Sequence, residues 1–188
     1  LIECGWIVSV DPNIGDLKGA KILIEDDKII DIGANLDAEV DEVLDASALI
    51  VLPGLINAHL HVWQTGTKLI GSEWVSPDYH KNMHANIATR YNAEDTYLGN
   101  LFGALSQIDN GTTTVLDWCH NLRDLEMAER ALDGLEESNI RAVFGHGTAK
   151  PPVIEGEVPY TDIPHPQDRI DHLRRHRLTG DDRLVTLA

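Results

Sequence analysis

The residues of this sequence best suited to chemistry are two histidines separated by a single leucine, His59 and His61. They end an apolar run that begins at residue 55 and is typical of a buried β-strand, in which alternate side chains point to the same face. Asn57, His59 and His61 therefore share one face of the predicted strand. Two imidazoles spaced in this way can converge on one metal ion at about 2.0–2.1 Å per bond. The same spacing also recurs on protein surfaces, so the context has to decide.

Further candidates follow the next two predicted strands. The stretch Trp118-Cys119-His120 follows the second strand, and His146 follows the third. Because the carboxyl ends of parallel strands meet at one edge of a sheet, we expect His120 either to contact a ligand near His61 or to be a satisfied structural histidine. Cys119 is interpreted as a small buried residue rather than a nucleophile.

The other histidines are interpreted as surface residues. His80 and His84 lie four residues apart, which favours an exposed helix over a second metal site. Three more occur among prolines and arginines: His165, His172 and His176.

The elements that must position these residues fall into two stretches that meet near residue 53. In the first, β-branched and apolar runs predict strands over 6–10, 20–25, 28–32 and 44–52. The turn Asp26-Asp27 between the second and third of these runs indicates a hairpin.

The second stretch alternates strands with helices. Strands are predicted over 55–61, 112–118, 141–145 and 183–187, and helices over 92–110, 122–138 and 168–177. An N-cap pattern at Asn92 and a stop at Gly111 bound the first helix, and residues 150–166 are rich in proline and predict a loop. This order is typical of right-handed βαβ units and predicts an α/β fold with a parallel sheet.

Composition excludes several classes of protein. The chain has 188 residues, of which 15 are basic and 31 acidic, giving a formal net charge of −16. Such a chain repels phosphate backbones, so no nucleic acid is expected as a partner. No apolar run approaches the roughly 20 residues of a membrane span. The two cysteines cannot form a disulfide framework, which fits a cytoplasmic location.

The stretch 51–61, which reads VLPGLINAHLH, resembles the first barrel strand of the amidohydrolase superfamily. The hairpin over 20–33 resembles the family's small β-sandwich, and residues 110–115, NGTTTV, resemble its entry to the second barrel strand. The resemblance implies strands of a small β-sandwich over 1–53, followed over 54–188 by the first three to four units of a (β/α)₈ barrel. Barrel enzymes keep their active sites at the carboxyl ends of the strands.

In that family the pair corresponding to His59 and His61 binds one divalent metal ion, usually zinc and sometimes iron. The resemblance implies hydrolysis by a metal-bound hydroxide. Dihydroorotase-like members carry an arginine where this sequence has Trp63, whereas Trp63 and Gln64 resemble the cytosine and purine deaminase and triazine chlorohydrolase branch. The implied substrate is a purine- or triazine-like heterocycle that undergoes deamination.

The expected substrate contacts are Gln64, Trp63, Trp118 and His120. The amide of Gln64 can donate and accept hydrogen bonds at the edge of a heterocycle, although it could instead cap the strand end. Trp63, Trp74 and Trp118 could form an aromatic lining, or could each pack in the core.

Two of the expected metal ligands are in this sequence, and the family takes the others and its proton shuttle from later strands. We therefore expect the chain to be the N-terminal part of a longer enzyme, inactive alone, with the catalytic residues beyond Ala188 and a homo-oligomeric full-length form. The alternatives are a chlorohydrolase or another C–N hydrolase using the same site, and a non-catalytic truncated metal-binding protein.

Overall fold

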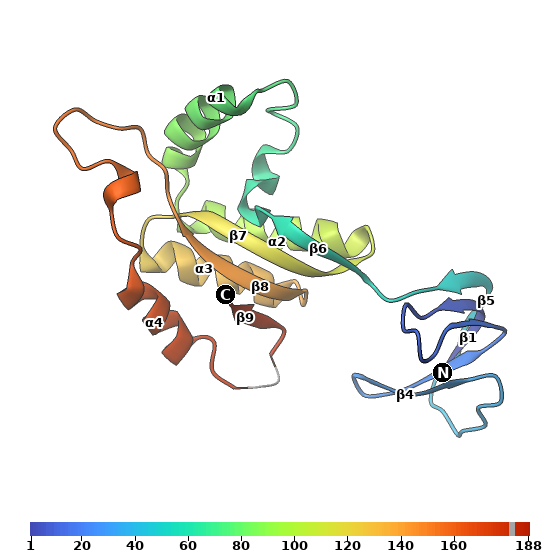
Figure 1. Cartoon of the computed structure of the whole chain (residues 1–188). Coiled ribbons are helices and arrows are strands. Elements are labelled where there is room, and N and C mark those ends of the chain that lie inside the picture. The colour runs from blue at the N-terminus through green and yellow to red at the C-terminus, as the bar shows by residue number, and fades with distance from the viewer. Residues whose placement is uncertain (181–182) are drawn as a thin grey trace. The chain divides into compact units, whose positions relative to one another are not determined.

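The structure is a computed structural model that describes residues 1–180 and 183–188. The chain divides into two compact units, Leu1–Gly54 and Leu55–Ala188, each built on its own β-sheet. Figure 1 labels the α-helices and most of the strands along the chain.

The first unit is a five-stranded sheet centred on β1. Four strands follow the order β2-β1-β3-β4 with antiparallel pairing, and β5 pairs parallel to β1. The strands are β1 Ile2–Val8, β2 Asp16–Lys18, β3 Lys21–Glu25, β4 Lys28–Gly33 and β5 Leu44–Val51. The hairpin predicted at Asp26-Asp27 is confirmed, and Asp26 adopts a left-handed φ of 54° in its turn. The small core contains Cys4, Ile7, Ala20 and Ile22.

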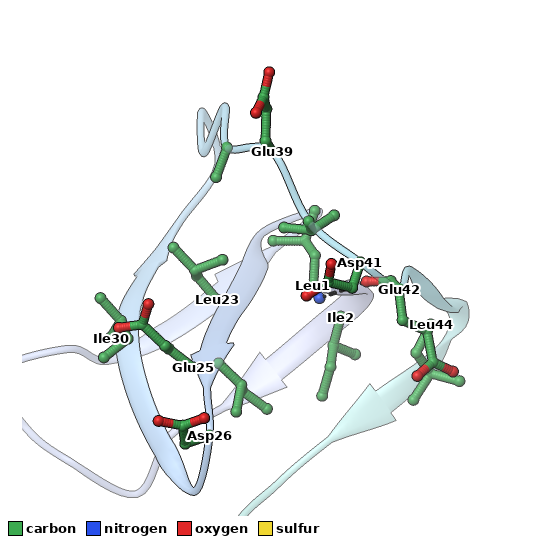
Figure 2. A pocket seen from close by; sticks show the side chains of 13 residues that line it. Leu1, Ile2, Leu23, Glu25, Asp26, Ile30, Glu39, Asp41, Glu42 and Leu44 are labelled. Carbon is green, nitrogen blue, oxygen red and sulfur yellow. Dashed lines mark hydrogen bonds between the residues drawn. The ribbon is translucent and has the colours of Figure 1, made fainter.

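A cavity of about 790 Å³ lies in this unit between the β3–β4 hairpin and the segment that leads into β5. Figure 2 shows its lining, which mixes apolar side chains such as Ile2 and Leu23 with the carboxylates of Glu25, Glu39 and Glu42. All three of these glutamates are exposed. Exposed carboxylates of this kind are typical of a solvated anionic surface.

The second unit contains a four-stranded parallel sheet in the chain order β6-β7-β8-β9, as predicted. Its strands are β6 Leu55–Leu60, β7 Thr112–Leu122, β8 Arg141–Thr148 and β9 Val185–Leu187. The connecting helices are α2 Ala93–Asp109, α3 Leu125–Glu137 and α4 Gln167–His176, and η4 is a short turn at Tyr160–Asp162 in the proline-rich loop. Within the residues that the structure describes, this sheet is open.

Between β6 and α2 the chain forms a series of short helical segments. They are the 3₁₀ helix η1 Val62–Thr67, the single turn α1 Ser76–Tyr79, the π-helix η2 His80–Ile87 and the 3₁₀ turn η3 Ala88–Arg90. The sequence predicts the exposed helix around His80 but not the π-helical geometry.

The core of the second unit lies between the sheet and its helices. Val115 and Cys119 of β7 and Phe144 of β8 pack there with Ala128 and Leu132 of α3, all fully buried. Burial raises the pKa of the Cys119 thiol well above its ordinary value. A buried, protonated thiol is a poor nucleophile, which confirms Cys119 as a small core residue.

Helix α2 begins and ends where the sequence predicts. The Asn92 side chain accepts a hydrogen bond from the Asp95 backbone N–H at 2.9 Å, and the Asp95 carboxylate accepts one from the Asn92 N–H at 2.9 Å. This reciprocal arrangement satisfies two N–H groups that would otherwise lack partners. Gly111 follows the helix with a φ of 80°, which glycine adopts without steric cost.

The buried face of α2 is formed by small residues rather than by the large apolar ones. Leu98 and Phe102, whose spacing helps to predict the helix, are 40% and 61% exposed. Gly99 and Gly103 instead face η1, where a Cβ on Gly99 would stand 2.4 Å from the Trp63 carbonyl oxygen. The helix therefore approaches η1 backbone to backbone, which only residues without a side chain allow.

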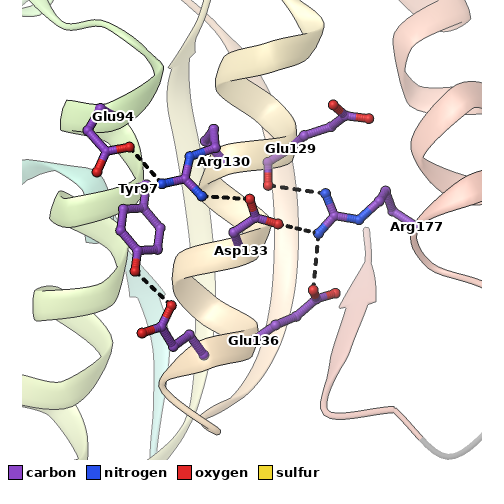
Figure 3. Close-up of polar contacts among 8 residues, drawn as sticks. Glu94, Tyr97, Glu129, Arg130, Asp133, Glu136 and Arg177 are labelled. Atoms are coloured by element: carbon purple, nitrogen blue, oxygen red, sulfur yellow. Dashed lines mark hydrogen bonds and ion pairs between the residues drawn. The ribbon is translucent and has the colours of Figure 1, made fainter.

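Ion pairs connect α2, α3 and the chain after α4 (Figure 3). Arg130 of α3 contacts Glu94 at 2.7 Å and Asp133 at 2.8 Å. Arg177 contacts Asp133 at 2.6 Å and Glu136 at 3.1 Å. Asp133 thus joins two arginines from separate segments. Because these groups are partly exposed, solvent weakens each pair, and the network contributes mainly orientation.

One expectation about β6 is wrong. The sequence predicts a buried strand, but Leu55 is 53% and Ile56 73% exposed. The reason is topological: in the described part of the chain β6 is an edge strand that pairs only with β7. Of the helices in the described residues, none combines the length and the apolar character needed to cross a membrane.

Candidate active site

The two histidines of the motif lie together at the carboxyl end of β6. The ring centroids of His59 and His61 are 4.9 Å apart, and the rings are nearly perpendicular. His61 Nδ1 lies 2.9 Å from the Trp118 carbonyl oxygen. Since a carbonyl can only accept, Nδ1–H donates, and Nε2 keeps its lone pair. Fixing one ring nitrogen in this way is how proteins orient a histidine for metal binding.

The residues present fit part of a metal site. His59 is exposed and His61 half-buried, so both rings are accessible to an ion between them. Among the described residues, no three histidine, cysteine, aspartate or glutamate side chains form a group that could hold a metal. The chain therefore offers an imidazole pair with one ring already oriented.

Parallel pairing carries Trp118 and His120 of β7 alongside this pair. The His120 ring lies 4.0 Å from that of His61, and the Trp118 ring lies 5.8 Å from that of His59. His120 is 4% exposed, whereas Trp118 is 50% exposed. The structure thus brings four of the residues singled out in the sequence into one cluster, with one aromatic face open to solvent.

Trp63 corrects an expectation. It is expected to contact substrate, but its side chain is fully buried. Its ring packs against Tyr91 at 5.1 Å and against His120 at 5.6 Å. The close approach of α2 to η1 encloses the indole, so Trp63 supports His120 from within the core.

The side chain of Gln64 makes its hydrogen bond outside this histidine cluster, to Tyr79. Its amide Nε2 donates to the Tyr79 hydroxyl at 2.5 Å. The two residues line a cavity of about 470 Å³ together with Trp74 and Met83. The side chain of Gln64 therefore joins η1 to α1 rather than capping the end of β6.

His84 is the site residue that sequence reasoning misses. The expectation of an exposed helix is wrong for it, since His84 is only 2% exposed. Its ring lies 4.8 Å from His120 and 4.9 Å from Tyr79. The apolar residues Tyr79, Met83 and Ile87 recur every four positions around it, and that spacing could have indicated a buried helix face.

Burial keeps the inner imidazoles neutral. Burial away from solvent is the main cause that lowers the pKa of His120 to about 3, and the nearby His61 and His84 contribute in the same direction. Burial is also the main cause that lowers the pKa of His84 to about 4, and the charge of Lys150 lowers it further. The pKa of His61 is lowered as well, mainly by burial. A neutral imidazole has one donor and one acceptor nitrogen, so each ring can either bind a cation or hydrogen-bond a heterocycle.

Asp117 anchors the turn that follows the motif. It is fully buried, and its Oδ1 accepts a hydrogen bond from the Val62 backbone N–H at 3.0 Å. Burial raises the pKa of this carboxyl to about 7, against the opposing effect of that hydrogen bond. Asp117 thus fixes the backbone immediately after His61.

His146 lines a cavity of about 370 Å³ together with Trp118 and His120, although its ring packs elsewhere. It is 8% exposed, and its ring packs at 5.3 Å against that of His165. Burial lowers the pKa of His146 to about 4. His165 and His176 are exposed, as expected of surface histidines, and His172 is half-buried with its Nε2 3.3 Å from Glu129.

Known proteins resemble this chain in sequence, although no family model matches it. A 5'-deoxyadenosine deaminase of Methanosarcina acetivorans is 31% identical over 147 residues, which make up 78% of this chain and 33% of that protein. A 5-methylthioadenosine/S-adenosylhomocysteine deaminase of Carboxydothermus hydrogenoformans is 34% identical over 129 residues, or 67% of this chain and 28% of that protein.

Solved structures share the fold. A variant of the atrazine chlorohydrolase of Arthrobacter aurescens TC1, complexed with zinc and atraton, matches with a TM-score of 0.78 at 19% identity, covering 99% of this chain and 45% of that one. A guanine deaminase of C. acetobutylicum with bound guanine matches with a TM-score of 0.70 at 18% identity, covering 99% and 44%. The chain belongs to the amidohydrolase superfamily. This amidohydrolase chain spans about a third of the length of the curated relatives that it matches.

Proposed function

We propose that this protein is a metal-dependent amidohydrolase that hydrolytically deaminates a purine- or triazine-like heterocycle. The observation that carries the proposal is the meeting of His59 and His61 with His120 at the carboxyl ends of two adjacent parallel strands. Ligand sites of barrel and open α/β sheets lie at this end of the strands. The sequence relatives named as adenosine-type deaminases support the choice of reaction.

His59 and His61 hold one divalent ion in this proposal, zinc in preference to iron. Zinc is supported by the atrazine chlorohydrolase, which is complexed with it, and by an adenosine deaminase of Xanthomonas campestris with bound zinc, which matches with a TM-score of 0.73 at 18% identity. When bound, such an ion supplies Lewis acidity and lowers the pKa of water. The Nδ1–H bond of His61 to the Trp118 carbonyl presents Nε2 for this role.

The substrate lies against Trp118, His120 and Gln64. The half-exposed indole of Trp118 offers a flat apolar face to a heterocycle. The neutral ring of His120 donates a hydrogen bond to a ring nitrogen of the substrate or accepts one from it. The amide of Gln64 exchanges its hydrogen bond with Tyr79 for hydrogen bonds to the edge of the heterocycle. Deamination replaces the exocyclic amino group by an oxygen from water and releases ammonia.

The proposal extends to architecture and assembly. Residues 54–188 supply the first units of a (β/α)₈ barrel, and residues 1–53 supply strands of a small β-sandwich. The amidohydrolase fold of the solved structures supports this arrangement. We further propose that the enzyme is a homo-oligomer and that it is located in the cytoplasm. The two free cysteines support the location.

A chlorohydrolase is the second candidate, favoured by the TM-score of 0.78 with the atrazine enzyme. The two reactions differ in the leaving group, so one experiment distinguishes them. The protein, purified from its natural reading frame, is incubated with 5'-deoxyadenosine, guanine and atrazine, and ammonia and chloride are measured. Ammonia from a purine supports deamination, and chloride from atrazine supports the second candidate.

Metal content is measured on the same preparation. We expect His59→Ala to lose bound zinc or iron, while the exposed control His176→Ala retains it. A wild-type protein that holds less than about half an equivalent of metal and releases neither product would overturn the proposal.

A further inference from the structure

The segment η2, His80–Ile87, is a π-helix, the rarest helix type in this structure. Helices of this kind are rare and occur frequently at functional sites. It continues directly from α1, and its two buried side chains are Met83 and His84. Met83 joins the hydrophobic core, whereas His84 brings a polar ring into a nearly solvent-free position.

The contacts of His84 connect the two sides of the candidate site. On one side its ring packs against His120, which in turn lies 4.0 Å from His61. On the other side it packs edge-on against Tyr79, whose hydroxyl accepts the Gln64 amide. A continuous series of aromatic and polar contacts therefore runs from the metal-side imidazoles to the substrate-side amide.

Simple core packing does not account for a histidine here. His84 Nδ1 is buried without a hydrogen-bond partner among the described residues. A buried polar atom without a partner destabilises the folded state, a cost that a leucine or phenylalanine would avoid. His80, from the same helix, stacks on the outer face of the ring at 5.4 Å and 29°. The ring is thus held between His80, Tyr79 and His120, an arrangement that restricts its rotation.

We propose that His84 is a positioning residue that holds the imidazole of His120 beside His61 and the ring of Tyr79 beneath Gln64. This inference rests on the proposed function, because it assigns His120 and Gln64 to the substrate. Small displacements of substrate contacts are costly to catalysis, since a shift of about 1 Å can cost about 100-fold in rate. His84 itself touches neither substrate nor metal in this account.

The test compares His84→Phe, which keeps an aromatic ring and removes both nitrogens, with His84→Gln, which keeps a donor and an acceptor. His176→Phe on the exposed end of α4 is the matched control. Imidazole ¹⁵N–¹H spectra of the protein report the environment of the His120 ring without any turnover. Ammonia release gives KM and kcat, and emission spectroscopy gives bound metal.

We expect His84→Phe to shift the His120 ring resonances and to raise KM about tenfold, with kcat lowered less and metal content unchanged. The KM of His84→Gln should lie between those of His84→Phe and the wild type, and the KM of His176→Phe should equal that of the wild type. Unchanged His120 resonances in both His84 variants, or an equal rise in KM in the control, would overturn the positioning role. If the wild type released no ammonia, the proposed function would fail, whereas the His120 resonances would still decide the role of His84.

Discussion

Replacing Asp117 by asparagine should remove a pH dependence of stability that the wild-type protein carries. The carboxyl is fully buried, and its pKa is raised from 3.8 to about 7. Ionisation is therefore harder in the folded state than in the unfolded chain. Between these two pH values the unfolded chain has released the proton and the folded protein still binds it, so stability falls as the pH rises.

Each unit of that interval removes up to about 1.4 kcal/mol from the free energy of unfolding. From pH 5 to pH 7 the loss reaches about 2 kcal/mol, and it levels off at about 3 kcal/mol above the folded pKa. The asparagine side chain of the variant cannot ionise, and its oxygen can still accept the Val62 N–H that Asp117 Oδ1 accepts at 3.0 Å. The free energy of unfolding of Asp117→Asn, relative to that of the wild type, should therefore rise by about 3 kcal/mol between pH 5 and pH 8.

Urea unfolding at pH 5, 6, 7 and 8 measures this difference. Far-ultraviolet circular dichroism suits the assay, because the α-helices that the structure describes all belong to Leu55–Ala188, the unit that contains Asp117. The exposed Asp109→Asn is the matched control and should follow the wild type at every pH. If the free energy of unfolding of Asp117→Asn and that of the wild type changed in parallel with pH across this range, the reasoning would be refuted.

Four further variants at three positions test the packing, the helix cap and the ion pairs. Gly99→Ala should lower the free energy of unfolding by about 1–3 kcal/mol, because a Cβ there meets the Trp63 carbonyl oxygen at 2.4 Å; a wild-type urea midpoint would contradict the close approach of α2 to η1. Asn92→Ala should cost about 1 kcal/mol by removing the cap of α2, whereas Asn92→Asp should cost much less; equal losses in a thermal melt would argue against the capping role. Arg177→Met should cost at most about 1 kcal/mol and only at low salt; the same loss in about 1 M NaCl would show that packing, not charge, is responsible.

Most strands and the helices α2, α3 and α4 could be predicted because they depend on local pattern, whereas the short strand β2 and the short helical segments η1 and η3 are not predicted. Alternating β-branched runs, the Asn92 cap and the positive φ at Gly111 act within a few residues, and each lies where the sequence indicates. The pairing of β6 with β7, which brings His120 to His61, follows from the parallel order of the strands.

The rest depends on packing that the local pattern does not encode. Leu98 and Phe102 dominate the helical periodicity of α2, yet the glycines on another face decide which side meets η1. Trp63 is buried as a consequence of that choice. His84 is itself polar and lies beside Lys81 and Asn82 in the sequence, so its burial against His120 depends on the packing of the π-helix η2.

The consecutive order of β6, β7, β8 and β9 also bears on how the second unit assembles. Each strand pairs with the one made just before it, so a ribosome delivers every strand to an edge that already exists. Growth can proceed by addition at one side, with no insertion between strands already paired, although each crossover has to be closed first. The His61–His120 contact joins the first two strands of that series, so it can form before β8 and β9 have been synthesised.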